Sequence, residues 1–248
     1  MYERIRDRLA VALDVDTLLE AGVVVEALRD YVGLFKVGLQ LFTGEGARVI
    51  GSIKGLGGKV FLDLKFHDIP NTVAAAARVV TAMGVDVFNV HACGGSEMMQ
   101  AAVEATSQEA IRRGIARPTV LAVTVLTSIN DDILSRELVV GQRVGEQVVH
   151  LARLAKGAGV DGVVASPREV GAIREACGGD FTILTPGIRP LWSAGKDDQK
   201  RITTPKEAIA LGANYIVVGR PILRAGDMVE ATRRILDEMA EAPGMACL

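Results

Sequence analysis

The sequence predicts an α/β protein that folds as a (β/α)8 TIM barrel, in a single domain over residues 1–248. Short runs of β-branched residues recur along the chain, and each is followed by a longer stretch whose apolar residues have helical spacing. Strands that alternate with helices pair in parallel, and nearly continuous apolar strands indicate that both faces of the sheet are buried. A closed barrel with an outer ring of helices satisfies both requirements, and barrels of this length commonly form one domain.

Eight strands are expected, each ending in a polar or glycine-containing turn: Leu9–Asp14, Leu34–Leu39, Lys59–Lys65, Val87–Ala92, Thr119–Thr127, Gly162–Ser166, Phe181–Gly187 and Tyr215–Gly219. Helical spacing identifies seven stretches between and after them: Thr17–Tyr31, Thr72–Met83, Ser96–Arg113, Gly141–Gly157, Pro167–Ala176, Thr204–Leu211 and Asp227–Ala240. The spacing of the strands is irregular, which excludes a solenoid of copied repeats.

Two segments fall outside this alternation. Residues 189–201 follow the seventh strand as a long polar loop, which is either a mobile lid or a solvated surface loop. The tail at 242–248 contains Pro243 and Gly244, so we expect it to fray or to pack against a neighbouring molecule.

The composition argues against several classes of function. Lys and Arg number 28 against 30 Asp and Glu, and 4% of the residues are aromatic, so the chain lacks the basic surface of a nucleic-acid binder. The 3 cysteines are widely spaced without a Cys-x-x-Cys pair, which argues against a disulfide framework and a zinc site. Charged residues interrupt every apolar stretch, and no signal peptide is recognisable. We therefore expect a cytoplasmic protein without a membrane or nucleic-acid partner.

The end of the third strand carries the densest group of charges. Side chains alternate along a strand with period two, so Asp63 and Lys65 are expected to share the inward face of the barrel. Burying this pair costs desolvation free energy that their attraction only partly offsets. Asp68 follows, and two carboxylates around one lysine favour its protonated form, which suits a proton donor rather than an amine nucleophile. The alternative is an ion-pair network that fixes the rim of the barrel.

Other strand ends add candidate residues. Asp14 ends the first strand, and Lys36 interrupts the apolar second strand, so Lys36 requires a partner or a ligand. The seventh and eighth strands end in Thr185–Arg189 (TPGIR) and Val217–Pro221 (VVGRP), where such barrels often bind phosphate. Glycine permits close approach of an anion and arginine donates a fork of hydrogen bonds, so we expect a phosphorylated small molecule. The alternative is tight turns with surface arginines.

The segment after the third strand has further local features. Ile69 precedes Pro70 and is expected to be extended, with Asn71 or Thr72 capping the next helix. A metal site is an alternative, with the ligands His67, Asp68, Asp63 and His91. We favour no metal, because His91 is explained more simply as a hydrogen-bonded histidine at the rim. Neither a P-loop nor a dinucleotide-binding glycine motif is present.

The segment Asp63–Thr72 (DLKFHDIPNT) closely resembles the signature of the orotidine 5′-phosphate decarboxylase family in its bacterial form. The resemblance spans the chain, with these further segments in the family's order: Leu13–Val15, Phe35–Gly38, Val123–Ser128, Thr185–Arg189, Asp197–Gln199 and Val218–Arg220. The pattern Asp-x-Lys-x-x-Asp alone is less specific, because related barrels that decarboxylate or condense sugar phosphates share it.

The resemblance implies a cofactor-free conversion of orotidine 5′-phosphate to UMP and CO2, by a homodimer with sites at the subunit interface. Lys65 would stabilise and then protonate a carbanion at C6, Asp63 would lie beside the substrate carboxylate, and Asp68 of the partner subunit would complete the charge network. The resemblance also implies substrate binding by Asp14 and Lys36 (ribose hydroxyls), Thr127 (pyrimidine edge), Thr72 (ribose or phosphate side, across the interface), Ile69, and Arg189, Gln199, Gly219 and Arg220 (phosphate).

Two rival functions remain open from the sequence. A magnesium-dependent sugar-phosphate decarboxylase or aldolase on the same barrel resembles this chain at the third strand, but typically has an acidic residue where this chain has Lys36. A non-catalytic sensor of phosphorylated ligands would not need Asp63 and Lys65, and both are present.

Overall fold

A computed structural model describes residues 3–193 and 203–243 of the chain. The eight parallel strands follow one another in chain order in a closed barrel, which confirms the predicted fold class. The strands are β1 (Leu9–Ala12), β2 (Leu34–Val37), β3 (Val60–Phe66), β4 (Val87–His91), β5 (Thr119–Val123), β6 (Gly162–Val164), β7 (Thr182–Thr185) and β8 (Tyr215–Val218). Each overlaps its predicted range, although β5 ends at Val123 rather than Thr127.

The chain divides into two compact units. The first joins the chain up to Leu64 with the chain from Thr185 onward, and the second is Lys65–Leu184. In the first unit, Val11 of β1 pairs with Phe35 of β2 on one side and with Val218 of β8 on the other. All three side chains are buried, as expected for a strand covered on both faces.

The helices of the first unit are α1 (Glu3–Arg6), α2 (Leu18–Leu28), α3 (Leu39–Glu45), α4 (Arg48–Gly55), η4 (Leu191–Ser193), α9 (Pro205–Ala210), α10 (Arg220–Leu223) and α11 (Met228–Ala240). Three predicted ranges begin at the residue that caps the helix: Thr17, Thr204 and Asp227 accept hydrogen bonds from backbone N–H groups of the first turn. Helices α1, α3, α4 and α10 lie outside the ranges predicted from sequence.

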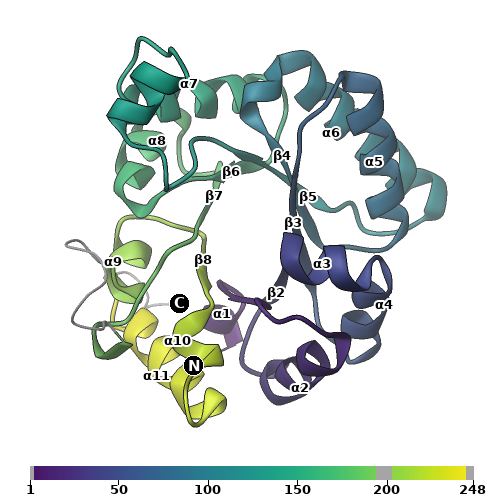
Figure 1. Ribbon diagram of the computed structural model, residues 1–248, viewed down its shortest axis with the longest axis vertical. Coiled ribbons are helices and arrows are strands. Elements are labelled where there is room, and N and C mark those ends of the chain that lie inside the picture. The colour runs from purple at the N-terminus through teal and green to yellow at the C-terminus, as the bar shows by residue number, and fades with distance from the viewer. Residues whose placement is uncertain (1–2, 194–202, 244–248) are drawn as a thin grey trace. The chain divides into compact units, whose positions relative to one another are not determined.

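The second unit contains β4, β5 and β6 in parallel register, with Ala122 of β5 opposite Val90 and Val163. Its helices are α5 (Pro70–Ala82), η1 (Ala92–Gly94), α6 (Gly95–Arg113), the π-helix η2 (Ile133–Glu137), α7 (Val144–Gly157), η3 (Pro167–Glu169) and α8 (Val170–Cys177). Helices α5 and α6 lie side by side, as do α7 and α8 (Figure 1). Among the described residues, none of the helices is long and apolar enough to span a lipid bilayer.

The start of α5 differs from the prediction. Neither Asn71 nor Thr72 caps this helix, because it begins at Pro70 with Ile69 as the N-cap residue and no side-chain cap. Proline suits the first helical position, since its missing N–H would have no partner there and its φ is already helical. Ile69 has ψ 151°, the extended conformation expected of a residue before proline.

Candidate functional site

Lys36 is held between two carboxylates of the first unit. Its Nζ lies 3.5 Å from Asp14 Oδ1, just after β1, and 3.5 Å from Asp63 Oδ2 on β3. The side chains of Lys36 and Asp63 are only 13% and 15% exposed, whereas that of Asp14 is 50% exposed. Lys36 therefore has the partners that its place in an apolar strand requires. The half-exposed Asp14 can accept hydrogen bonds from the hydroxyl groups of a ligand.

The turn after β8 approaches this cluster closely at Gly219. A Cβ atom at this position would lie 3.2 Å from the Asp14 carboxylate oxygen Oδ2 and 3.2 Å from Ala12 Cβ. Both distances are tighter than ordinary van der Waals contact, so glycine allows the end of β8 to lie against the end of β1. The predicted binding residues Asp14, Lys36 and Gly219 are thus brought together within one unit.

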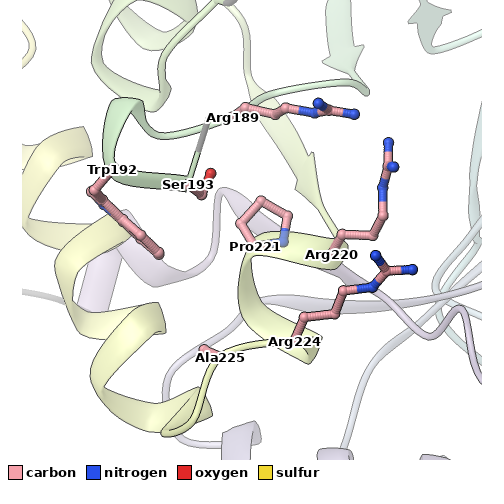
Figure 2. Close-up of a pocket in the computed structure, with 7 residues that line it drawn as sticks. All are labelled: Arg189, Trp192, Ser193, Arg220, Pro221, Arg224 and Ala225. Atoms are coloured by element: carbon pink, nitrogen blue, oxygen red, sulfur yellow. The ribbon is translucent and has the colours of Figure 1, made fainter. Parts of the chain in front are cut away.

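A basic pocket lies in the same unit, next to η4 and α10 (Figure 2). Its volume is about 360 Å³, and the residues that line it are Arg189, Trp192, Ser193, Arg220, Pro221, Arg224 and Ala225. The guanidinium groups of Arg189, Arg220 and Arg224 point to the same side of the pocket, away from Trp192 (Figure 2). Within the described parts of the chain, the pocket lining contains three cations and no carboxylate, so it is suited to an anion such as a phosphate group.

Contacts at the start of the predicted loop fix Arg189 and Trp192. The Arg189 N–H donates to the Thr203 carbonyl at 3.1 Å. The Arg234 guanidinium of α11 lies over the Trp192 ring, 4.3 Å from its centroid, which is a favourable cation–π distance. Gln199, the rest of the predicted loop from 194 to 201, and the tail from 244 lie outside the described residues.

Lys65 has an unusual backbone in the second unit. Its φ is +55°, in the left-handed region that costs an L-residue other than glycine roughly 1–2 kcal/mol. The Lys65 N–H donates a 2.8 Å hydrogen bond to the side-chain Oδ1 of Asn89 on β4, and Asn89 is fully buried. Lys65 lies within β3, but its left-handed φ departs from the regular extended backbone on which the period-two prediction for Asp63 and Lys65 is based.

Two histidines lie near this strand end. The rings of His67 and His91 stack with centroids 5.4 Å apart, and His91 Nδ1 accepts the Cys93 N–H at 3.4 Å. Burial lowers the pKa of His91, and the charges of His67 and Lys65 lower it further, so the neutral imidazole is favoured. Among the described residues, no three His, Cys, Asp or Glu side chains are grouped as metal ligands.

The remaining predicted residues of the second unit are exposed. Asp68 and Thr72 flank the start of α5, and Ile69 between them is 65% exposed. The Asp68 Oδ1 accepts the Ile69 N–H at 2.6 Å, which orders this turn. Thr127 lies in the turn after β5, where the Ile129 N–H donates to the Leu126 carbonyl.

Two residues of interest were missed by the sequence analysis. Arg224 lies four residues after Arg220, and this helical spacing puts both on one face, which could have indicated a second pocket cation. Asn89 is a polar residue between the apolar residues Phe88 and Val90 of β4, and a buried amide there requires a partner. That its partner is the Lys65 backbone could not have been found from spacing alone.

Comparison with known proteins agrees with the fold and the residues. Residues 7–235 match the family described as "Orotidine 5'-phosphate decarboxylase / HUMPS family". The chain belongs to this family. A protein of Heliobacterium modesticaldum named orotidine 5′-phosphate decarboxylase is 55% identical, covering 95% of this chain and 97% of its own. One of Syntrophotalea carbinolica with the same name is 54% identical, covering 98% of each chain.

Comparison with a solved structure agrees with the family match and with the two relatives. The chain is similar to the crystal structure of orotidine 5′-phosphate decarboxylase from Lactobacillus acidophilus, with a TM-score of 0.83 and 41% identity. The similarity covers 93% of this chain and 98% of that one. The range matched by the decarboxylase family contains every site residue predicted from the sequence, from Asp14 to Arg220.

Proposed function

We propose that this chain is a carboxy-lyase that converts orotidine 5′-phosphate to UMP and CO2 in pyrimidine biosynthesis without a cofactor. The observation that carries the proposal is its 55% identity, over almost the full length of both chains, to a relative with the decarboxylase name. The pairing of Lys36 with Asp14 and Asp63 supports it against a magnesium-dependent sugar-phosphate enzyme, because a cation stands where such an enzyme typically has an acid.

Lys65 is the proposed catalytic acid. The bond between C6 of the pyrimidine and the carboxylate breaks with its electron pair remaining on C6, and CO2 departs. The Lys65 ammonium stabilises this carbanion and donates a proton to C6, which leaves a neutral amine that regains its proton from water. Asp63 lies beside the substrate carboxylate, and Asp68 of the partner subunit completes the charge network.

The other residues bind the substrate. Asp14 and Lys36 hold the ribose hydroxyls, and the exposed Thr127 binds the pyrimidine edge. The phosphate is bound by Arg189 and Arg220 of the basic pocket. Gly219, which precedes Arg220, and Gln199, which lies outside the described residues, complete the proposed phosphate site. Thr72 contributes to the ribose or phosphate side from across a subunit interface, and Ile69 is a further substrate-binding residue.

The chemistry needs both the lysine and the phosphate pocket. An ammonium ~3 Å from the developing carbanion gains ~5 kcal/mol at an effective dielectric constant near 20. That free energy corresponds to an acceleration of roughly four decades. Loss of CO2 from an unactivated vinylic carbon is so slow that this acceleration alone does not make it useful. Binding energy from the remote phosphate must therefore contribute to excluding water and positioning the reacting carbon.

The proposal includes a homodimer in the cytoplasm, with each chain acting as one domain. Ile69, just before α5, is 65% exposed, and Val79, near the end of α5, is 53% exposed, so each presents an apolar side chain that a second copy can cover. A nucleotide carrying a phosphate dianion does not cross a bilayer unaided, so the proposed substrate is met inside the cell.

One assay tests the proposed function. The purified chain is incubated with orotidine 5′-phosphate in the presence of EDTA, and the pyrimidine absorbance is followed. We expect turnover at the same rate with and without EDTA. Turnover that EDTA abolishes would favour the magnesium-dependent rival, and binding of the nucleotide without turnover would favour the sensor.

A further inference from the structure

The buried amide of Asn89 has no part in the roles assigned above, although it contacts the backbone of the proposed catalytic lysine. Asn89 lies in β4 between the apolar residues Phe88 and Val90, and its side chain is fully buried. Its Oδ1 accepts the Lys65 N–H at 2.8 Å. Lys65 is also one of the few non-glycine residues with positive φ in the described parts of the chain.

These observations are connected by the geometry of the strand. In a regular parallel ladder, a backbone N–H of β3 donates to a backbone carbonyl of the neighbouring strand. A left-handed residue turns its N–H away from that direction, and here a side-chain oxygen accepts it instead. Because φ and ψ set the direction of the Cα–Cβ bond, the conformation that Asn89 stabilises also sets where the Lys65 side chain starts.

We propose that Asn89 is a positioning residue, which holds the Lys65 backbone in its left-handed conformation and thereby directs the ammonium towards C6 of the pyrimidine. This inference rests on the proposed function, in which Lys65 is the proton donor. Asn89 acts only through Lys65, so its loss should lower kcat while leaving nucleotide affinity nearly unchanged.

The test compares Asn89→Leu with Asn89→Asp. Leucine has the same branching and number of side-chain heavy atoms as asparagine, is bulkier and has no acceptor, whereas aspartate keeps an oxygen where Oδ1 stands. We expect Asn89→Leu to lower kcat about 100-fold, the loss typical of a misplaced reacting group, with the inhibition constant of UMP within about threefold of wild type. Asn89→Asp should stay within about tenfold of wild-type kcat.

A matched control separates positioning from stability. Val90→Ala removes buried methyl groups from the next residue of the same strand, on the opposite face. It should lower Tm as Asn89→Leu does, but leave kcat within about twofold of wild type. Exchange of the C6 hydrogen of UMP in D2O should fall in parallel with kcat in Asn89→Leu and not in Val90→Ala. If Asn89→Leu does not fold, Asn89→Ala is measured in the same way.

A crystal structure of the Asn89→Leu variant, or of Asn89→Ala in its place, provides a readout that does not depend on activity. We expect Lys65 to leave the left-handed region and take an extended φ. The inference is overturned if Lys65 keeps its positive φ there, if the variant retains wild-type kcat, or if Val90→Ala loses as much kcat. If the wild-type protein does not turn over orotidine 5′-phosphate, the proposed function is refuted instead. The crystal structure of the variant still tests whether Asn89 holds the Lys65 backbone in its left-handed conformation.

Discussion

Lys65 is the residue on which the proposed chemistry depends. Replacing it with alanine removes the proposed proton donor, so Lys65→Ala should lower kcat by at least roughly four decades. Binding of UMP should be largely retained, because the phosphate and ribose contacts belong to other residues. Steady-state turnover and UMP titration by calorimetry measure the two effects. Substantial residual turnover would eliminate Lys65 as the proton donor.

The three arginines of the basic pocket allow a second test at single residues. Arg220→Ala should lower kcat/KM severely, and Arg224→Ala should lower it about tenfold or more, because each removes a proposed charge-assisted hydrogen bond to the phosphate. Arg233→Ala is the control, since Arg233 contacts Tyr31 and does not line the pocket.

The same pocket variants can be examined with a substrate that lacks its phosphate. Added phosphite dianion should partly rescue turnover of this truncated substrate by wild type, and less so by Arg220→Ala or Arg224→Ala. An absence of rescue in the wild type would remove the contribution of remote binding energy from the proposed mechanism.

The sequence predicts the surroundings of some site residues and not the backbone conformation of others. Lys36 was predicted to need a partner because it interrupts an apolar strand, and Asp14 and Asp63 are its partners. The left-handed Lys65 could not be predicted, because no glycine or asparagine marks it and the hydrogen bond that stabilises it comes from another strand. Local pattern identifies charged residues in apolar strands but not the backbone that orients them.

At the level of elements, capping residues explain which boundaries were predicted well. Thr17 and Thr204 begin capping boxes with Glu20 and Glu207, a pattern that is recognisable in the sequence. Helices α3 and α4 were missed because Gly44, Gly46 and Gly51 weaken the helical signal between the second and third strands. These helices form nevertheless, since they bury Leu41 and Val49 against the unit.

Helix α6 carries an ion-pair network whose effect on stability depends on pH. Glu109 accepts hydrogen bonds from Arg112 at 2.8 and 2.6 Å and also from Arg113, and these bonds lower its pKa from 4.5 to about 2. A carboxylate with a lowered folded-state pKa stabilises the fold above its unfolded pKa. This contribution is lost as the pH falls from 4.5 towards about 2.

The variant Glu109→Gln should therefore be less stable than wild type near neutral pH, and the difference should shrink below about pH 4.5. Urea unfolding at a series of pH values measures this difference in the free energy of unfolding. Glu104→Gln, an exposed glutamate of the same helix, is the matched control and should show little pH-dependent difference. A constant gap between Glu109→Gln and wild type across this range would contradict the assigned cause.

At the scale of the whole molecule, the barrel could be predicted because its strands are mostly apolar and alternate with helices. Assembly could not be predicted in the same way. The exposed residues Asp68, Ile69 and Thr72 show where a second chain could complete a site, but exposure alone does not distinguish a partner from solvent.

Mixing two inactive variants tests whether each site takes residues from both chains. Homodimers of Lys65→Ala and of Asp68→Ala should each be nearly inactive, because both sites of the first lack Lys65 and both sites of the second lack Asp68. In a heterodimer, one site has both Lys65 and Asp68, and the other site has neither. Random reassociation makes about half of the dimers heterodimers, so about a quarter of wild-type activity should be restored. Activity is measured after the two variants are unfolded together and refolded.

The control mixes Lys65→Ala with the double variant that also carries Asp68→Ala, and no heterodimer of that pair contains an intact site. If Lys65 and Asp68 of one chain instead served the same site, mixing would restore nothing in either experiment, and the interface role of Asp68 would be excluded. If activity is restored only in the first experiment, each catalytic site is built from residues of two copies of this chain. Neither variant alone can supply both Lys65 and Asp68 to one site.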